Sequence, residues 1–461
     1  MATTTTETEE HLSLKLIVNE ESNKVFFLTF PLGTIARLVE KDSNTGPVTV
    51  GCLNTLYRSV KDLDEACLWD EAVKHMLLQP SNFAEDYCNT LKLNIDDTSP
   101  TKFYACRNNY FGCESLDLTT STNSKHRCRM CGSSFSGKSS VSHKHFRKGF
   151  ANDVATFVIT DNLAVMPNSM DNTSFSMLEE FGIINPSSVK EMVLNLSKQK
   201  VLELLKCSLL SNSTLTDFFL EKKPSPGISS LFSVAEISGY IQIIVKLVIK
   251  KSDGKVLFAQ GEQDFANLLL SFLTFPLGGV VRVLGTYSSL GCIDVLYRSV
   301  ADLNENKYFV SKEAKNRLIH PCISPMLKLK NPIFPILDPG FVEYYRYDRL
   351  NGRHVQYFKA GEDKSYLFKF PKIEVSDLIL EDYVKGPAMY YATDDLFVAP
   401  LSPISALGFL NRLKIPLTDL KEKIVTIGFT DCLRILKASL TSTSALTNGL
   451  AHLLTDVNEE N

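Results

Sequence analysis

Four cysteines in the first half of the chain have a spacing that suits a metal ion. Six residues separate Cys106 from Cys113, two separate Cys128 from Cys131, and Gly132 follows directly. The two thiolates of a Cys-x2-Cys-Gly turn can reach the same ion, and four thiolates complete the closed tetrahedral shell of a structural zinc ion. The sequence therefore predicts a structural zinc site with Cys106, Cys113, Cys128 and Cys131 as ligands.

The wide spacing of the first pair leaves other interpretations open. Its six intervening residues exceed the two to four that are usual between paired zinc ligands. One histidine could replace a cysteine, and the candidates are His126, His143 and His145. The thiols could also be free of metal. A redox pair of Cys128 and Cys131 is disfavoured, because no βαβ pattern surrounds them.

Residues 132–139 match the phosphate-binding pattern G-x4-G-K-S. In such a loop backbone amides hold phosphates, Lys138 would reach the terminal phosphates and Ser139 would bind magnesium. The pattern requires a buried strand before the loop and a helix after it. Here the preceding residues are polar and basic, and the following residues have no apolar helical face. We therefore expect a Ser/Gly loop that binds no nucleotide.

The same region is strongly basic. Between residues 125 and 148 there are seven Lys or Arg and no Asp or Glu, with Phe135 and Phe146 interleaved. Basic side chains can follow phosphates, and aromatic rings can stack on bases. Six of these basic residues are candidate nucleic-acid contacts: Lys125, Arg127, Arg129, Lys144, Arg147 and Lys148. The alternative is a solvated insert that binds no nucleic acid.

Several segments occur twice, which predicts two homologous repeats. The pairs are Phe-Leu-Thr-Phe-Pro-Leu-Gly at 27–33 and 272–278, Leu-Tyr-Arg-Ser-Val at 56–60 and 296–300, Thr-Asp-Asn/Asp-Leu at 160–163 and 393–396, and Leu/Ile-Leu-Lys-Cys/Ala-Ser-Leu at 204–209 and 435–440. The acidic residues Asp161, Asp394 and Asp395 recur just before strand-like runs, where turn chemistry explains them. A carboxylate pair between the repeats is the alternative.

The cysteine cluster has no counterpart in the second repeat. Tyr347 aligns with Cys106, and no cysteine lies between Cys322 and Cys432. The repeated fold therefore does not require the metal. Zinc would instead hold together an insert that has little core of its own.

Local patterns predict how each repeat begins and ends. In the second repeat, strand-like residues 241–249 and 255–258 flank Ser-Asp-Gly, which is typical of a hairpin, and an amphipathic helix follows at 265–273. The first repeat is predicted to keep the hairpin, at 14–18 and 24–27, but is 14 residues shorter and lacks the helix. Either another segment covers the hairpin, or the chain derives from an aberrant splice or gene model. Short helices are expected at 204–209 and 435–440.

The predicted fold is α+β, with antiparallel hairpins and packed helices in each repeat. We expect a disordered N-terminus at 1–10 and a first repeat at 11–220 that contains the cysteine insert at 103–150. A Pro/Gly/Ser-rich linker at 221–239 leads to a second repeat at 240–455 and a tail at 456–461.

The repeated segments, with Gly-Cys-x3-Leu-Tyr-Arg-Ser-Val at Gly51 and Gly291, resemble the plant family catalogued as domain of unknown function 674. The resemblance covers nearly the whole chain. It implies the two-repeat architecture and paired cysteines in the insert, but no established activity. The family pattern includes the opening helix, so its absence after Val25 is a departure.

Composition narrows the function classes. The net charge of −3 gives no overall attraction to nucleic acid or anionic membrane. Eleven cysteines without a secretory signal favour a reducing compartment, so we expect a cytoplasmic or nuclear protein with no membrane segment. Most of the single cysteines are expected to be small buried hydrophobes. Our first hypothesis is a non-enzymatic protein that binds an unknown protein partner. Nucleic-acid binding through the insert is second, and an enzyme of unknown reaction is third.

Overall fold

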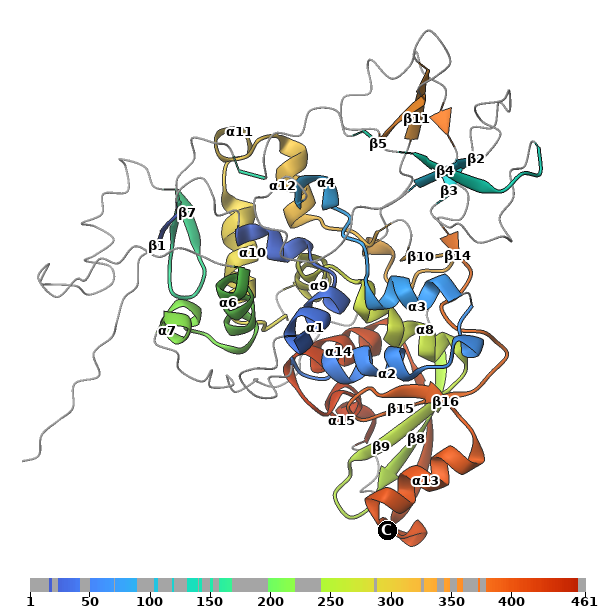
Figure 1. Cartoon of the computed structure of the whole chain (residues 1–461). Helices are drawn as coiled ribbons and strands as arrows, with labels where there is room; N and C mark the ends of the chain where they lie inside the picture. The colour runs from blue at the N-terminus through green and yellow to red at the C-terminus, as the bar shows by residue number, and fades with distance from the viewer. Residues whose placement is uncertain are drawn as a thin grey trace, which may run out of the picture.

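The computed structural model describes 18 segments of the chain (Figure 1), among which no helix is long and apolar enough to cross a lipid bilayer. They are 16–18, 24–41, 50–69, 71–88, 103–106, 118–119, 131–139, 141–142, 150–151, 157–167, 198–219, 242–285, 288–324, 327–337, 344–348, 355–359, 372–373 and 379–454. The predicted disordered N-terminus, linker and tail lie outside them.

Helices and strands alternate along both halves, so the chain is α+β. Those of the N-terminal half are β1 (Leu16–Val18), the 3-10 helix η1 (Lys24–Thr29), α1 (Leu32–Lys41), α2 (Leu53–Asp62), η3 (Glu65–Cys67), α3 (Glu71–Leu78), α4 (Glu85–Cys88), β2 (Phe103–Cys106), β3 (Leu118–Thr119), β4 (Phe135–Ser139), β5 (Val141–Ser142), β6 (Phe157–Ile159), β7 (Val165–Pro167), α6 (Lys198–Leu210) and α7 (Thr214–Phe219).

The C-terminal half contains the longer strands. Its elements are β8 (Ile243–Lys250), β9 (Val256–Gly261), α8 (Gln263–Ser271), η6 (Phe272–Thr274), α9 (Leu277–Leu284), α10 (Cys292–Asp302), α11 (Glu305–Tyr308), α12 (Lys312–Ile319), β10 (Lys328–Leu329), η9 (Pro335–Leu337), β11 (Tyr344–Asp348), β12 (Val355–Lys359), β13 (Lys372–Ile373), β14 (Ile379–Leu380), β15 (Tyr390–Thr393), β16 (Val398–Pro400), α13 (Pro403–Leu413), η11 (Leu417–Asp419), β17 (Leu420–Ile427), α14 (Phe429–Thr441), α15 (Ala445–Gly449) and α16 (Ala451–Leu454).

The C-terminal half contains a five-stranded antiparallel sheet with strand order β16-β15-β9-β8-β17. The hairpin predicted from Ser-Asp-Gly is confirmed, because Gly254 has a φ of +69° in the turn between β8 and β9. The predicted amphipathic helix is also confirmed as α8, which leads directly into η6. Residues 265–271 of α8 are all buried, so this helix packs deep in the core.

The N-terminal half has a three-stranded sheet with order β1-β6-β7. The prediction of a hairpin here is wrong, because residues 24–27 lie in the 3-10 helix η1 and not in a strand. β1 is antiparallel to β6, with Leu16 opposite Ile159, and β9 is antiparallel to β15, with Ala259 opposite Ala392. The shortened segment supplies one strand only. That strand lies at one end of the described sheet, where it satisfies the hydrogen-bonding groups of β6.

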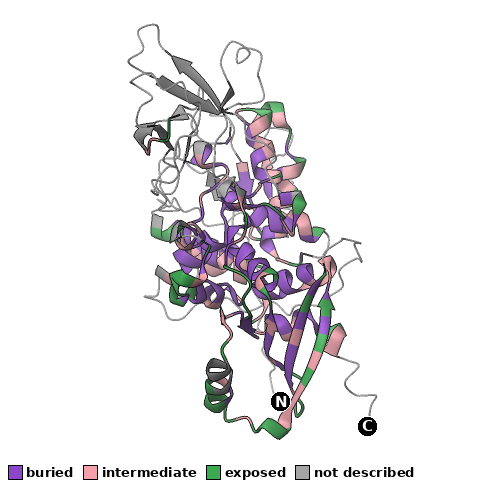
Figure 2. Cartoon of the chain, turned by 90° about the vertical axis from the view of Figure 1, so that its right-hand side faces the viewer, coloured by how far each residue is buried: buried purple, intermediate pink, exposed green. Residues whose placement is uncertain are grey.

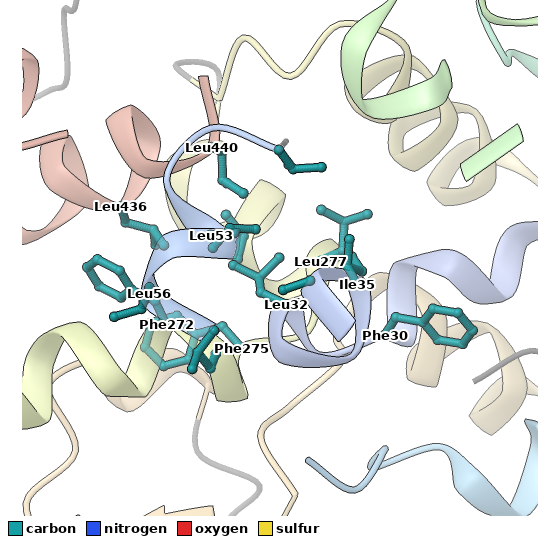
Figure 3. Close-up of a cluster of buried hydrophobic side chains, with 14 of the residues drawn as sticks. Phe30, Leu32, Ile35, Leu53, Leu56, Phe272, Phe275, Leu277, Leu436 and Leu440 are labelled. Atoms are coloured by element: carbon teal, nitrogen blue, oxygen red, sulfur yellow. The ribbon is translucent and has the colours of Figure 1, made fainter. Parts of the chain in front are cut away.

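One hydrophobic core runs through both halves. Figure 3 shows side chains from each half in a single cluster: Phe30, Leu32, Ile35, Leu53 and Leu56 with Phe272, Phe275, Leu277, Leu436 and Leu440. All ten are at most 6% exposed. Burial of this extent makes the contact between the halves part of the core and not a surface interface.

The two Phe-Pro-Leu segments run antiparallel past each other and exchange hydrogen bonds. The Leu32 N–H donates to the Phe275 carbonyl (N···O 2.8 Å), and the Leu277 N–H donates to the Phe30 carbonyl (2.9 Å). Because matching residues bond each other reciprocally, the repeated segment is the seam between the halves.

Each half also supplies a helix to the other. The Cys52 N–H at the start of α2 donates to the Ser439 carbonyl of α14 (2.8 Å), and the Ser299 hydroxyl of α10 accepts from the Val165 N–H of β7 (3.0 Å). α2 also contacts β16, and α10 contacts α6. Figure 1 shows α10 beside α6 and α2 beside α14. The halves are therefore intertwined.

The cysteine region contributes to two small sheets. β2 lies between β3 and β4, and β5 joins the strands of the C-terminal half in the order β13-β11-β12-β5. β5 runs parallel to β12, with Val141 opposite Tyr357. Residues from the two halves thus meet in one sheet at this end of the molecule.

Candidate functional site

Two of the four predicted zinc ligands lie within the described residues. Cys106 is the last residue of β2, and Cys131 is an exposed turn residue before β4. Cys113 and Cys128, and the side chain of Cys106, lie outside the described part of the chain. Within the described part of the chain, no three His, Cys, Asp or Glu side chains form a group that could hold a metal.

Strand pairing nevertheless places the flanking backbone. β2 is antiparallel to β4, with Cys106 opposite Phe135, and Cys131 lies four residues before Phe135. β2 is also antiparallel to β3, with Ala105 opposite Leu118. The end of β2 and the starts of β3 and β4 therefore lie at the same end of this sheet. Each cysteine either occupies one of these strand ends or lies in a segment that leads to one.

The phosphate-binding pattern does not have the local structure of a P-loop. Gly137, Lys138 and Ser139 lie in β4, where Lys138 is opposite Tyr104. In a P-loop the Lys and Ser open a helix whose N-terminus faces the phosphates. A strand at this position provides neither the turn of amides nor the helix.

The other candidates from this region lie outside the described residues. These are the six basic residues Lys125, Arg127, Arg129, Lys144, Arg147 and Lys148, and the alternative ligands His126, His143 and His145.

Most cysteines outside this region are buried thiols. Cys52, Cys292 and Cys432 are at most 1% exposed, as predicted, while Cys67 and Cys207 are partly exposed. Burial raises the pKa of Cys52 and of Cys432 to about 12 and that of Cys207 to about 11. A thiol is nucleophilic only as thiolate, so these groups are inert at neutral pH.

Asp161 and Asp394 each accept two hydrogen bonds from a single threonine, in the same arrangement. One carboxylate oxygen of Asp394 accepts from the Thr447 N–H (2.7 Å) and the other from the Thr447 hydroxyl (2.9 Å). Asp161 accepts from the N–H and hydroxyl of Thr216 at the same distances. Each carboxylate thus fixes the start of a C-terminal helix in its own half, α15 or α7. This is the fold role predicted for recurring acidic residues.

The sequence did not predict a cluster of buried polar side chains where Lys437 of α14 meets the start of α10. Lys437 is 2% exposed, and its Nζ lies 3.3 Å from the Ser289 hydroxyl. Burial lowers the pKa of Lys437, and the nearby carboxylate of Asp294 opposes this shift. Asp294 accepts from the Leu290 N–H (2.9 Å) and from the Ser288 hydroxyl. The available signal was the lysine kept inside both apolar Leu-Lys-x-Ser-Leu segments.

Comparison with known proteins gives a family but no activity. No curated protein matches the chain. No solved structure matches it either. The family model described as "Protein of unknown function (DUF674)" matches residues 8–430. Because this match spans nearly the whole chain, the protein belongs to the DUF674 family.

Proposed function

We propose that the protein is a non-enzymatic interaction protein in which a structural zinc ion holds the insert at residues 103–150. The observation that carries the zinc proposal is the strand pairing around Cys106. It brings the end of β2 and the turn containing Cys131 to the same end of one sheet. Cys113 and Cys128 complete the ligand set. Four thiolates leave no open coordination position, so the zinc is structural and not catalytic.

The described polar residues support a binding role over catalysis. Asp161 and Asp394 use both oxygens to fix helix starts, and the buried thiols have raised pKa values. A carboxylate that uses both oxygens on one threonine, and a thiol that stays protonated at neutral pH, have structural roles. An exposed sheet edge in the C-terminal half offers a surface for a protein partner.

We also propose that the two halves are copies of one unit. Three observations support this proposal: the shared register of the β6–β7 and β15–β16 pairs, the reciprocal Phe-Pro-Leu bonds, and the matched Asp161 and Asp394 contacts. The second copy has β11 and β12 where the first has the cysteine insert. Zinc in the insert would then be an addition to the duplicated fold.

Elemental analysis tests the zinc site. The purified full chain should contain about one zinc ion, which should be lost in the double variant Cys128→Ser, Cys131→Ser. The control Cys67→Ser removes a partly exposed thiol outside the insert and should keep the metal. A well-folded wild-type chain without zinc would contradict the proposal.

A second candidate function is nucleic-acid binding through the insert, favoured by the seven basic and no acidic residues between positions 125 and 148. Its test is retention of the full chain on single-stranded RNA, which should weaken as salt increases. Neutralising Arg127, Arg129, Arg147 and Lys148 together should abolish retention. Equal retention by this variant, or no retention at low salt, would exclude it. A third candidate, an enzyme of unknown reaction, would gain support from nucleotide-dependent stabilisation that Lys138→Ala removes.

A further inference from the structure

The five-stranded sheet ends in a long exposed edge. β17 pairs with β8 along all eight of its residues, and it is the last strand in the sheet. In Figure 2 it runs along the lower right of the molecule, and from Glu422 on its exposed residues alternate with partly or fully buried ones. No described strand pairs with its outer side. An edge of this length is a template for pairing with another strand.

The hydrogen-bond pattern shows which backbone groups face outward. The Lys251 N–H donates to the Asp419 carbonyl (2.8 Å), so these two residues form a hydrogen-bonded pair next to β17. Such pairs alternate along an antiparallel ladder. Odd-numbered residues of β17 therefore bond β8, while Glu422, Ile424 and Thr426 direct their N–H and C=O groups to the outer side.

Two large apolar side chains are exposed on the outer face beside this edge, next to the Lys246–Glu422 ion pair. Ile424 on β17 is 72% exposed and Ile244 on β8 is 68% exposed. Elsewhere on this face α13 provides cover, since Leu410 packs with Val248 and Phe258. The sheet thus carries two large apolar side chains next to an edge with outward-facing backbone groups.

Two of the lysines at this edge, Lys246 and Lys423, have partners within the chain. Lys423 donates to the Leu453 carbonyl (2.7 Å), and Lys246 pairs with Glu422 (2.6 Å). Edge lysines block strand addition when a partner strand would leave them facing apolar groups or like charges. Here Lys246 and Lys423 already have partners on their own chain.

We propose that this edge pairs antiparallel with the same edge of a second copy of the chain, about a twofold axis at Ile424. The two Ile424 residues then lie opposite each other, and Glu422 lies opposite Thr426 of the second copy. All of these residues have outward-facing backbone groups, as the ladder requires. The result is one continuous ten-stranded sheet.

The charges and the exposed isoleucine of β17 together favour this register. A register centred on Lys423 sets two lysines opposite each other, and one centred on Glu422 sets two glutamates opposite each other. Like charges directly opposite are destabilising. A register centred on Ile424 or on Val425 avoids both. Only the axis at Ile424 sets the exposed Ile424 side chains of the two copies opposite each other, with Lys423 opposite Val425. Because the strand is complementary to itself in this register, a second copy fits the edge.

Sedimentation of the full chain tests the proposal. The wild type should be a dimer whose dissociation constant rises at least about tenfold in Ile424→Asp, because two carboxylates then face each other. The matched control is Ile244→Asp, which changes an equally exposed isoleucine one strand away from the edge. It should leave the dimer largely intact.

A second variant separates pairing from misfolding. Thr426→Pro removes an outward-facing N–H and no bond to β8, so the monomer should fold and the dimer should weaken. Hydrogen exchange in the peptide 420–427 should slow as protein concentration rises. A chain that stays monomeric at about 100 μM overturns the proposal. So does a dimer that neither edge variant weakens.

The dimer rests on the proposed interaction function, and its partner is a second copy of the chain. It does not depend on the zinc ion. A zinc-loaded monomer would overturn the dimer alone. A metal-free dimer would overturn the zinc site alone.

Discussion

Asp161 and Asp394 each accept two hydrogen bonds from one threonine, so their removal should have matched effects. Asp394→Ala leaves the part-buried donors of Thr447 without an acceptor. We expect a loss of about 1–3 kcal/mol in unfolding free energy by urea denaturation. Asp161→Ala should lose a similar amount. The exposed Asp62→Ala should change stability by less than about 0.5 kcal/mol. Little effect from both of these part-buried variants would contradict a fold role.

His452 on α16 gives a prediction about pH. Burial and the nearby Arg434 guanidinium lower the pKa of His452, and the carboxylate of Asp431, 2.9 Å away, only partly opposes this. A depressed histidine pKa means that the unfolded chain binds more protons below pH 6.5, so stability falls as pH decreases. His452→Gln should flatten this dependence in thermal melts between pH 7 and pH 5. A melting temperature that falls more steeply with decreasing pH in His452→Gln than in the wild type would contradict this assignment.

At the scale of elements, two glycines allow the halves to approach each other. A Cβ on Gly33 of α1 would lie 2.9 Å from the Leu273 carbonyl oxygen, and one on Gly278 of α9 would lie 3.0 Å from the Leu28 carbonyl oxygen. Either Gly→Ala change should cost about 1–3 kcal/mol in unfolding free energy, because the seam must open. Gly408 in α13 has no atom near such a Cβ. Gly408→Ala should therefore stabilise the chain, by about 0.5–1 kcal/mol.

The sequence predicts those helices and strands that are specified by a few neighbouring residues. The β8–β9 hairpin follows from Ser-Asp-Gly, and α8 follows from apolar spacing. η1 was predicted as a strand because Lys24 and Val25 match the start of β9 in sequence. Its structure is instead set by the seam, where residues 27–29 take the same 3-10 form as η6. β17 was not predicted, since exposed Ile424 breaks the alternation that marks a strand.

The same distinction holds for the candidate site. Cysteine spacing predicted ligands, but only long-range pairing of β2 with β3 and β4 shows that the flanking strand ends share one end of a sheet. Buried Lys437 was missed because its environment comes from the loop before α10, some 150 residues away in sequence.

At the scale of the whole molecule, the exchange of α2 and α10 predicts that neither half folds alone. Without residues 1–230, the surface of α14 and β16 that α2 covers becomes exposed, together with Phe275 at the seam. Exposed apolar surface of this kind leads to aggregation. We expect fragments 1–230 and 231–461 to be insoluble when expressed separately, and to copurify in equal amounts when expressed together. Fragment 64–230, which lacks α1 and α2, should fail to rescue the C-terminal half. A C-terminal fragment that unfolds cooperatively by itself would show that the exchanged helix is dispensable, and that the seam is a contact between two independent domains.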